Sequence, residues 1–533
     1  MSVSVWFDGS HMPTRIPLNE DFKTDICIVG GGIAGLTTAY LLMKEGKKVC
    51  LIESAELGSG QSGRTTAHFS NALDDRLYKI ESYHGEEGLR LAIQSHSEAI
   101  RKVKHIVRDE KISCELKEVS GYLFALDDEN ESVLEDELEA AHKAGLVSVE
   151  KLAFSPFTNF KSGPCLHFPK QMQLHPVKYM AALADKIIKG GSQIYTNSHV
   201  VEMKGGENSF VKTKNGRIVY CDSIVVATNT PINDLFAIHT KQAAYRTYVL
   251  GFKIQKGFFP NVLLWDTLDP YHYIRVEEQA DHDILIVGGQ DHKTGQSDDP
   301  QECYKILEAW TRKHFSFVRE LLYQWSGQVM EPVDGLAYLG RNPMDEKNVY
   351  VITGDSGNGM THGTIGAMLI TDQIMGRENP WEKLYAPNRI SLKAAKNYIR
   401  ENANVAAQYA DWMIPGSKNQ LNMLPTNEGA IIRNGTKMVA AYKAHNGEVQ
   451  YMSAVCPHLA GIVKWNNAEK SWDCPCHGSR FDCHGNVIEG PAISGLKKLN
   501  SEFTEVQENE NNHAVEPKKL KLPYDQRPED RHL

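Results

Sequence analysis

The stretch Asp25-Ile-Cys-Ile-Val-Gly-Gly-Gly-Ile-Ala-Gly35 decides the fold of this chain. Its apolar beginning, residues 25–29, predicts a buried parallel strand, and the glycines lead into an apolar helix over residues 36–46. A second apolar run, residues 49–52, ends at Glu53. Because strand, helix and strand follow one another within about 30 residues, they form a βαβ unit, and we expect an α/β, Rossmann-like domain.

The glycine spacing in this unit predicts a dinucleotide site. Gly30 allows a tight turn, Gly32 lets the backbone approach a pyrophosphate, and Gly35 lets the helix pack closely on the strand. The helix N-terminus would face the phosphate charge, and Glu53 could accept hydrogen bonds from the ribose hydroxyls. The alternative is a glycine-rich turn that binds nothing. The strand before it and the carboxylate after it favour the dinucleotide site, whose expected contacts here are Gly30, Gly32, Ile33, Ala34, Gly35 and Glu53.

Composition excludes several classes of protein. The 533 residues carry 58 Lys and Arg against 67 Asp and Glu, a net charge of −9, and this length predicts about three to four compact units. Apolar residues at 41% and charged residues at 23% are typical of a globular protein. No apolar run approaches the roughly 18 residues of a membrane span, and the first residues do not resemble an export signal. We therefore expect a cytoplasmic protein whose partners are not nucleic acids.

Further along the chain the dinucleotide fold is interrupted. Apolar runs at 222–228 and 349–354 predict more strands of the same sheet. The insertions at about 85–150 and 235–330 contain an amphipathic helix and alternating strands, which predict an α+β substrate subdomain. Residues 392–413 have apolar positions at helical spacing and predict a connecting helix, which Pro415-Gly416-Ser417 would end. A turn-rich segment of short strands follows at 426–505, and then a charged tail.

Several pieces beyond the glycine motif resemble the D-amino-acid oxidase superfamily of FAD-dependent enzymes, which includes glycine oxidase and sarcosine oxidase. The resemblance covers about residues 24–390. It is carried by Gly58-Ser-Gly-Gln-Ser-Gly-Arg-Thr-Thr-Ala67, Leu174-His-Pro176, His199-Val-Val-Glu-Met203, Val226-Ala-Thr228, Trp325-Ser-Gly327, Asp334-Gly335, Leu339-Gly340 and Thr353-Gly-Asp-Ser-Gly-Asn-Gly-Met-Thr361.

This resemblance implies where FAD would lie. Residues 62–66 would run along the ribityl chain and ring, and Val200 would touch the adenine through its backbone. The loop 354–361 would lead into a helix whose dipole stabilises negative charge on the flavin pyrimidine. No cysteine near Gly340 or Gly357 suggests a covalent tether, so we expect noncovalent FAD. The further FAD contacts expected in this way are Ser62, Gly63, Arg64, Thr65, Thr66, Val200, Ala227, Thr228, Gly354, Gly357, Gly359, Met360 and Thr361.

The substrate residues are weaker predictions. Tyr273 and Arg275 alternate along one strand and resemble the family's Tyr/Arg pair that holds a carboxylate, for which a bidentate Arg is suited. Two side chains on a solvated strand face are an alternative of equal weight. Tyr248 and His362 are further candidates for the substrate wall. No general base stands out.

The ten cysteines fall into two groups. Six are scattered singly and predict buried thiols: Cys27, Cys50, Cys114, Cys165, Cys221 and Cys303. The other four crowd together with histidines, in Cys456-Pro-His458, in Cys474-Pro-Cys-His477 and at Cys483. Two thiolates and two imidazoles indicate a metal site, and by ligand type alone it could be zinc.

The residues around these pairs resemble a Rieske [2Fe–2S] domain over 426–505, above all Trp472-Asp-Cys-Pro-Cys-His-Gly-Ser-Arg-Phe-Asp482. The resemblance implies that Cys456 and Cys474 bind one iron and that His458 and His477 bind the other. Cys476 and Cys483 would stay unliganded.

Departures from this Rieske pattern bear on the cluster's potential. Gly461 replaces the cysteine that would cross-link to Cys476, which fits a reducing compartment. Ser479 matches a serine that hydrogen-bonds the cluster, but Phe481 stands where a tyrosine does the same. Fewer such bonds predict a potential in the lower half of the roughly −150 to +300 mV range.

Together the two resemblances match a bacterial family of FAD-dependent oxidoreductases with a C-terminal, all-β Rieske domain. FAD takes two electrons as a hydride and the cluster takes one. We therefore expect a dehydrogenase of an amine or amino-acid-like substrate, acting on CH–NH bonds, that passes electrons singly through solvent-facing His458 and His477 to an external protein or quinone. A reductase fed through the Rieske centre, or a redox-sensing carrier without turnover, are the alternatives. The expected divisions are an arm 1–24, an FAD domain 25–391, a connection 392–425, a Rieske domain 426–507 and a tail 508–533.

Overall fold

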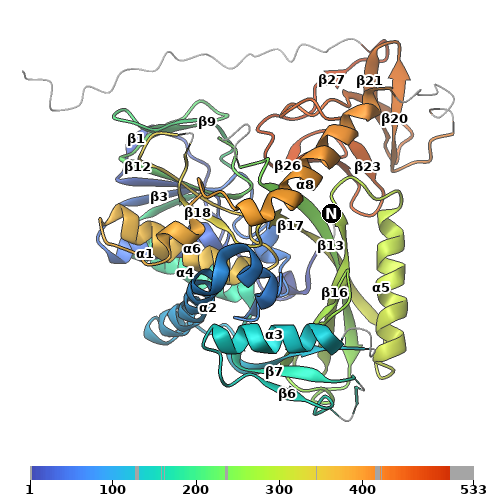
Figure 1. The fold of residues 1–533 in the computed structure, drawn as a ribbon. Coiled ribbons are helices and arrows are strands. Elements are labelled where there is room, and N and C mark those ends of the chain that lie inside the picture. The colour runs from blue at the N-terminus through green and yellow to red at the C-terminus, as the bar shows by residue number, and fades with distance from the viewer. Residues whose placement is uncertain are drawn as a thin grey trace, which may run out of the picture.

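The computed structural model describes residues 3–126, 131–157, 159–160, 162–233, 238–343, 345–413, 421 and 423–503. The predicted boundary at Pro415-Gly416-Ser417 and the charged tail 508–533 lie outside these residues. We call residues 3–391 the flavin half and the shorter, strand-rich residues 423–503 the C-terminal half. The two pack against each other, and helix α8 (Ala395–Gln408) runs from one to the other (Figure 1). Among the described helices, none combines the length and the apolar character needed to cross a membrane.

The predicted βαβ unit forms the centre of a six-stranded sheet. Five of its strands run parallel next to one another and are mostly buried, as expected for strands covered on both faces. Helices α1 (Ile33–Lys44) and α6 (Gly359–Ile374) pack together against it. In spatial order the strands are β18 (Tyr338–Arg341), β19 (Val349–Thr353), β12 (Ser223–Asn229), β2 (Ile26–Val29), β3 (Val49–Ile52) and β8 (Gln193–Tyr195).

A nine-stranded sheet forms the subdomain expected on the substrate side. Helix α5 (Pro300–His314) packs on two of its strands, β13 and β16, and a short strand, β6 (Glu150–Leu152), adds to β7. The main order is β17 (Leu321–Pro332), β13 (Gln242–Ile254), β16 (Asp283–Lys293), β15 (Tyr273–Glu278), β14 (Val262–Asp266), β5 (Lys117–Phe124), β7 (Cys165–Gln173) and β4 (His68–Phe69).

The remaining parts of the flavin half are a small sheet and helices on the surface. The small sheet has the order β1 (Phe22–Lys23), β11 (Ile218–Tyr220), β10 (Phe210–Thr213) and β9 (Val200–Lys204). The other helices are α2 (Leu77–Asp109), α3 (Glu131–Lys143), α4 (Pro176–Lys189) and α7 (Glu382–Tyr385). Residues at the chain's beginning pack onto this body, and Trp6 in a short 3-10 turn is fully buried.

The C-terminal half consists of two four-stranded antiparallel sheets that enclose a small core. One has the order β20 (Glu428–Asn434), β21 (Lys437–Lys443), β22 (Val449–Ser453) and β27 (Lys498–Leu499). The other has the order β23 (Lys464–Asn466), β24 (Ser471–Asp473), β25 (Arg480–Asp482) and β26 (Val487–Glu489). Its core includes Trp472 and Phe481, and side chains of the 395–413 segment pack against it.

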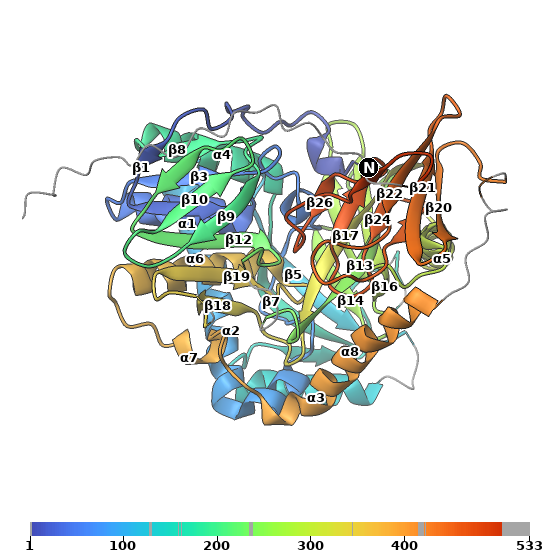
Figure 2. The ribbon, with the colours of Figure 1, turned by 90° about the horizontal axis from the view of Figure 1, so that it is seen from above.

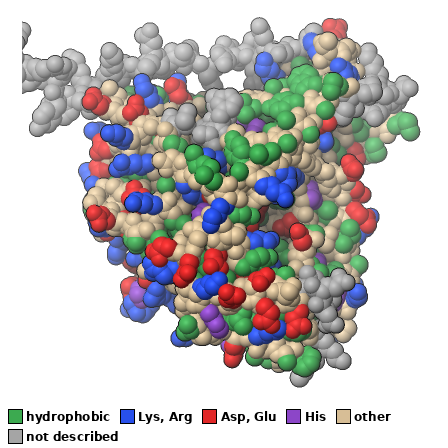
Figure 3. All heavy atoms as spheres, viewed as in Figure 1, with side chains coloured by type: hydrophobic (Ala, Val, Ile, Leu, Met, Phe, Trp, Pro, Cys, Tyr) green, Lys and Arg blue, Asp and Glu red, His purple; other side chains and the backbone are tan. Residues whose placement is uncertain are grey.

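This arrangement confirms the predicted fold class, an α/β domain with an α+β subdomain and an all-β domain at the end. Two elements differ from the expectation. Helix α2 is 33 residues long and is interrupted at Gly85, whose φ of 74° lies outside the helical region. Helix α8 keeps several apolar side chains exposed, with Ile399 at 67%, and hydrophobic side chains gather on this face of the molecule (Figure 3).

Candidate functional site

A cavity of about 1360 Å³ lies between the two halves of the chain. The turn from β2 to α1, the ends of β3 and β12, and the N-terminus of α6 form the wall of the flavin half. Residues 482, 484–490 and 492–498 of the C-terminal half also line it. Seen from above, β26 and its neighbours lie next to the flavin half, on the side of β17 and β13 (Figure 2).

The glycines of the motif are required by close contacts. Gly30 has a φ of +111°, and a Cβ there would lie 2.3 Å from the carbonyl oxygen of Ala227. A Cβ on Gly35 would lie 1.9 Å from the carbonyl oxygen of Gly30, so this glycine permits the helix to pack on the strand. The N-terminus of α1 opens toward the cavity, where the Gly31 amide donates to the Glu53 carboxylate over 2.7 Å. This cradle fits a dinucleotide pyrophosphate and ribose.

Most of the predicted FAD contacts line this single cavity. Four of them do not line it: Gly35, Gly63, Gly354 and Thr361. No cysteine of the described residues lines it, and noncovalent FAD stays a prediction. The residues that the structure brings together are Gly30, Gly32, Ile33, Ala34, Glu53, Ser62, Arg64, Thr65, Thr66, Val200, Ala227, Thr228, Gly357, Gly359 and Met360.

The backbone of residues 63–65 is anchored by side chains from distant parts of the chain. The indole of Trp6 donates to the carbonyl of Thr65 over 2.6 Å, and the indole of Trp325 donates to that of Arg64 over 2.8 Å. The Ser4 hydroxyl donates to the carbonyl of Gly63 over 2.5 Å. The beginning of the chain therefore helps to shape the flavin site, a role that its sequence did not indicate.

Asp74 and Asp291 are among the carboxyl groups that line the cavity, and the sequence did not single them out. Burial raises the pKa of Asp291 to about 7, and burial together with neighbouring Asp75 raises the pKa of Asp74 to about 7. Tyr273 lines the same region, and its hydroxyl lies 2.6 Å from that of Thr247. Carboxyls with pKa values near neutrality can exchange protons with a substrate at neutral pH, which marks them as functional candidates.

The structure separates the predicted Tyr273/Arg275 pair. Both side chains are buried, so neither lies on a solvated strand face. Tyr273 lines the cavity, whereas Arg275 does not. Its guanidinium forms an ion pair with Glu277 over 2.5 Å and donates to the carbonyls of Thr66, Ala67 and Leu174. Arg275 thus fixes the chain beside the flavin loop, and the structure gives it no contact with the cavity.

The other two candidate wall residues also have different surroundings. Tyr248 is fully buried outside the cavity, and its hydroxyl lies 2.9 Å from Nε2 of His292. His362 does line the cavity at the start of α6, with its Nδ1 2.9 Å from the carbonyl oxygen of Asp355. Burial lowers the pKa of His362 to about 4, so its imidazole is neutral at pH 7.

The four predicted cluster ligands come together as two pairs. Cys456 and Cys474 have their thiols within hydrogen-bonding reach, and the ring centroids of His458 and His477 are 5.1 Å apart. Within the described part of the chain, no three or more His, Cys, Asp or Glu side chains form a set that could hold one metal ion. Two thiols beside two imidazoles fit a Rieske cluster, because one iron takes each pair.

The imidazole pair, expected to face solvent, is half-buried and packs against the flavin half. The ring of His239, from the flavin half, packs against His458 and His477 with centroid distances of 4.8 and 5.9 Å. The loop that carries Cys474 and His477 is also held there, since Gln328 of β17 donates to the carbonyl of Gly478 over 3.1 Å. The histidine edge therefore lies at the interface with the flavin half.

The departures from the Rieske pattern have visible counterparts. A Cβ on Gly461 would lie 2.6 Å from Sγ of Cys476, so this position does oppose the cysteine that lacks a cross-link. The hydroxyl of Ser479 accepts from the amide of Ala492 over 3.0 Å and also contacts the Cys456 thiol. Phe481 is fully buried. None of the described cysteines forms a disulfide; five of the six scattered ones are buried and Cys303 is half-buried.

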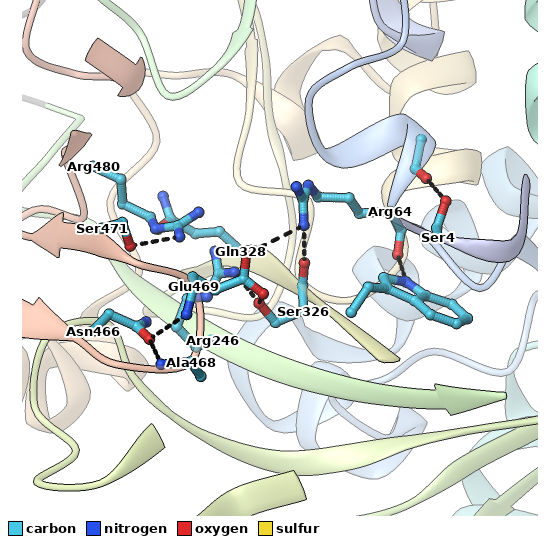
Figure 4. A network of polar contacts seen from close by, with 12 residues as sticks. Ser4, Arg64, Arg246, Ser326, Gln328, Asn466, Ala468, Glu469, Ser471 and Arg480 are labelled. Carbon is cyan, nitrogen blue, oxygen red and sulfur yellow. Dashed lines mark hydrogen bonds and ion pairs between the residues drawn. The ribbon is translucent and has the colours of Figure 1, made fainter. Parts of the chain in front are cut away.

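A buried polar network joins the flavin loop to the second half of the chain (Figure 4). Nη1 of Arg64 lies 3.9 Å from the carboxylate of Glu469 and donates to the carbonyl of Ser326 over 2.9 Å. The Ser326 hydroxyl donates to Glu469 over 2.7 Å and also bonds Arg246 of β13. A single chain of contacts thus reaches from the cavity wall into the sheet that carries Cys474.

The same network continues within the C-terminal half. Arg480 pairs with Asp473 over 2.9 Å and with Glu489 over 2.8 Å, and it donates to the Ser471 hydroxyl over 3.0 Å. Because Asp473 directly precedes Cys474, these contacts fix the strand from which the cluster loop leaves.

Comparison with protein-family models identifies both halves. The model for "FAD dependent oxidoreductase" matches residues 25–373, and the model for "Rieske [2Fe-2S] domain" matches residues 412–500. The Bacillus subtilis protein with the name "Putative Rieske 2Fe-2S iron-sulfur protein YhfW" is 30% identical over 93% of this chain and 97% of its own length. Gamma-glutamylputrescine oxidoreductase of Escherichia coli is 23% identical over 67% of this chain and 85% of its own.

Solved structures share the fold of the flavin half. Glycine oxidase from Geobacillus kaustophilus superposes with a TM-score of 0.58, at 17% sequence identity, over 69% of this chain and 99% of its own. The glycine cradle and the paired donors described above fit FAD and a [2Fe–2S] cluster. The chain belongs to the FAD-dependent oxidoreductase family and carries a C-terminal Rieske [2Fe–2S] domain.

Proposed function

We propose that the protein is a dehydrogenase that oxidises a CH–NH bond of an amine or amino-acid-like substrate and passes the electrons through its Rieske cluster to an external acceptor. The observation that carries this proposal is the shared cavity, because residues of the flavin site and of the Rieske domain line the same space. When bound, FAD accepts a hydride and the cluster accepts one electron at a time. The names of two similar proteins, gamma-glutamylputrescine oxidoreductase and glycine oxidase, support nitrogen-containing substrates.

Carboxyls in the cavity wall offer partners for a substrate ammonium group, and Arg76 in the same wall offers a partner for a carboxylate. The predicted carboxylate-binding Arg275 is engaged by Glu277, whereas Asp74 and Asp291 remain in the cavity wall. As carboxylates they would hold a substrate ammonium group, and above a pH of about 7 they could accept its proton. Removing that proton leaves the neutral amine from which a hydride can depart. Tyr273 would define one side of the space around the reacting carbon.

The test is anaerobic mixing of the purified holoprotein with diamines, polyamines, amino acids and N-methyl amino acids, with NADH as a separate arm. Bleaching of the flavin absorbance reports substrate oxidation, and electron paramagnetic resonance (EPR) reports reduction of the cluster. We expect an amine to bleach the flavin and a Rieske signal to follow. Asp291→Asn should weaken the response to that amine, while Asp298→Asn, at an exposed aspartate nearby, should not.

The other outcomes separate the alternatives. If only NADH reduces the protein and the cluster signal precedes flavin bleaching, the protein is a reductase fed through the Rieske centre. If only a chemical reductant acts, it is an electron carrier. If an amine bleaches the flavin and oxygen reoxidises it faster than any added protein or quinone acceptor, the dehydrogenase proposal is wrong and the protein is an oxidase.

A further inference from the structure

One histidine of the flavin half lies against both imidazole ligands of the cluster site. His239 is 3% exposed, and its ring meets those of His458 and His477 edge-on, with interplanar angles of 76° and 61°. The two ligand rings are also perpendicular to each other, at 89°. The three imidazoles therefore form one packed group in which His239 touches both of its neighbours.

The turn that carries His239 is held from two sides. The carbonyl of Thr240 accepts a hydrogen bond of 2.9 Å from the side chain of Asn402 on α8. On the other side, Nζ of Lys241 donates to the carbonyls of Pro387 and Arg389 over 3.1 and 3.0 Å. With its neighbours fixed in this way, the buried ring of His239 has a defined position relative to the Rieske domain.

The loop that carries Cys474 and His477 packs closely onto the same surface of the flavin half. A Cβ on Gly478, next to His477, would lie 2.3 Å from Cβ of Ala244 on β13, so only glycine permits this approach. Gln296 of the flavin half donates to the carbonyl of Pro475 over 3.1 Å. The imidazole pair therefore has the flavin half on one side and its own loop on the other.

We propose that His239 is a positioning residue for the Rieske cluster, which fixes the orientation of the imidazoles of His458 and His477. The orientation of an imidazole ligand and the packing around it tune the electronic structure of a metal centre. A rigid ring that contacts both ligands restricts their rotation and so gives the cluster one electronic environment. The proposal rests on the cluster alone and does not depend on which substrate the flavin oxidises.

The test compares His239→Ala, His239→Phe and His445→Ala in the full-length holoprotein. His445→Ala is the control, because His445 is an exposed histidine of the Rieske domain. Each variant is reduced with dithionite, the g-values and the ¹⁴N couplings of the ligand imidazoles are measured by EPR, and the midpoint potential is measured by titration. We expect His239→Ala to broaden the EPR lines at each g-value, alter the ¹⁴N couplings and shift the midpoint potential. His239→Phe, which keeps a packed ring, should restore all three.

Two results would overturn this assignment. The first is an EPR spectrum and a potential of His239→Ala that match those of the control. The second is a His239→Phe variant that is as perturbed as His239→Ala or that loses its cluster, since a packed ring would then not suffice. If His239→Ala alone fails to retain the cluster, normal spectra of His239→Phe support the proposal.

Discussion

Replacing Glu469 by glutamine removes the buried negative charge that faces the flavin loop. Its side chain is fully buried and lies 3.9 Å from the guanidinium of Arg64, which is itself 9% exposed. With an effective dielectric constant of about 20, one charge pair at that separation is worth about 4 kcal/mol. Burial already lowers the pKa of Arg64, and Glu469 opposes that effect. The variant leaves the buried cation without this partner, a loss of about 3–5 kcal/mol.

The assay follows the two cofactors separately during urea denaturation, the cluster by its visible absorbance and the flavin by its fluorescence. Because Glu469 joins the two halves, Glu469→Gln should lower the urea midpoints of both signals. Glu502→Gln, at an exposed glutamate of the Rieske half, should leave both within error of the wild type. Midpoints of Glu469→Gln that match those of this control would refute the reasoning. A loss confined to the cluster signal would show that the network does not connect the two halves.

Three further predictions follow from single contacts. Gly30→Ala should abolish FAD binding, measured by flavin content after purification, because its Cβ would lie 2.3 Å from the carbonyl oxygen of Ala227; retained flavin would contradict the cradle. Gly461→Cys should form a disulfide with Cys476 in oxidant and slow cluster loss, read by mass spectrometry and absorbance, whereas two free thiols would argue against the close approach of these two positions. Burial raises the folded-state pKa of Asp291 to about 7, so its contribution to the free energy of unfolding falls as pH rises from about 4 to 7. In flavin-free protein, Asp291→Asn should therefore raise the free energy of unfolding by up to roughly 4 kcal/mol at pH 8 and by little at pH 4. Equal gains at both pH values would refute the raised pKa.

Features set by neighbouring residues could be predicted from the sequence. The β2–α1–β3 unit follows from an apolar run, three spaced glycines and an acidic strand end, and the structure places these elements as expected. The pairing of two cysteines with two histidines likewise follows from short spacings. In both cases the residues that make the site are close together in the chain, so their pattern can be recognised without knowledge of the fold.

Features set by distant contacts could not be predicted in this way. The residues next to Asp74 and Asp291 in the sequence form no recognisable motif. Only the fold brings the loop with Asp74 and strand β16 with Asp291 to one cavity. Arg275 follows Tyr273 at the spacing of a carboxylate-binding pair, but its guanidinium forms an ion pair with Glu277, two residues further on. The contact of His239 with the cluster ligands joins segments more than 200 residues apart, about which local patterns carry no information.

The Rieske domain contributes one wall of the flavin cavity. Residues 484–490 and 492–498 line one side of that space. Displacing the Rieske domain would therefore remove one wall of the flavin cavity and open that side to solvent.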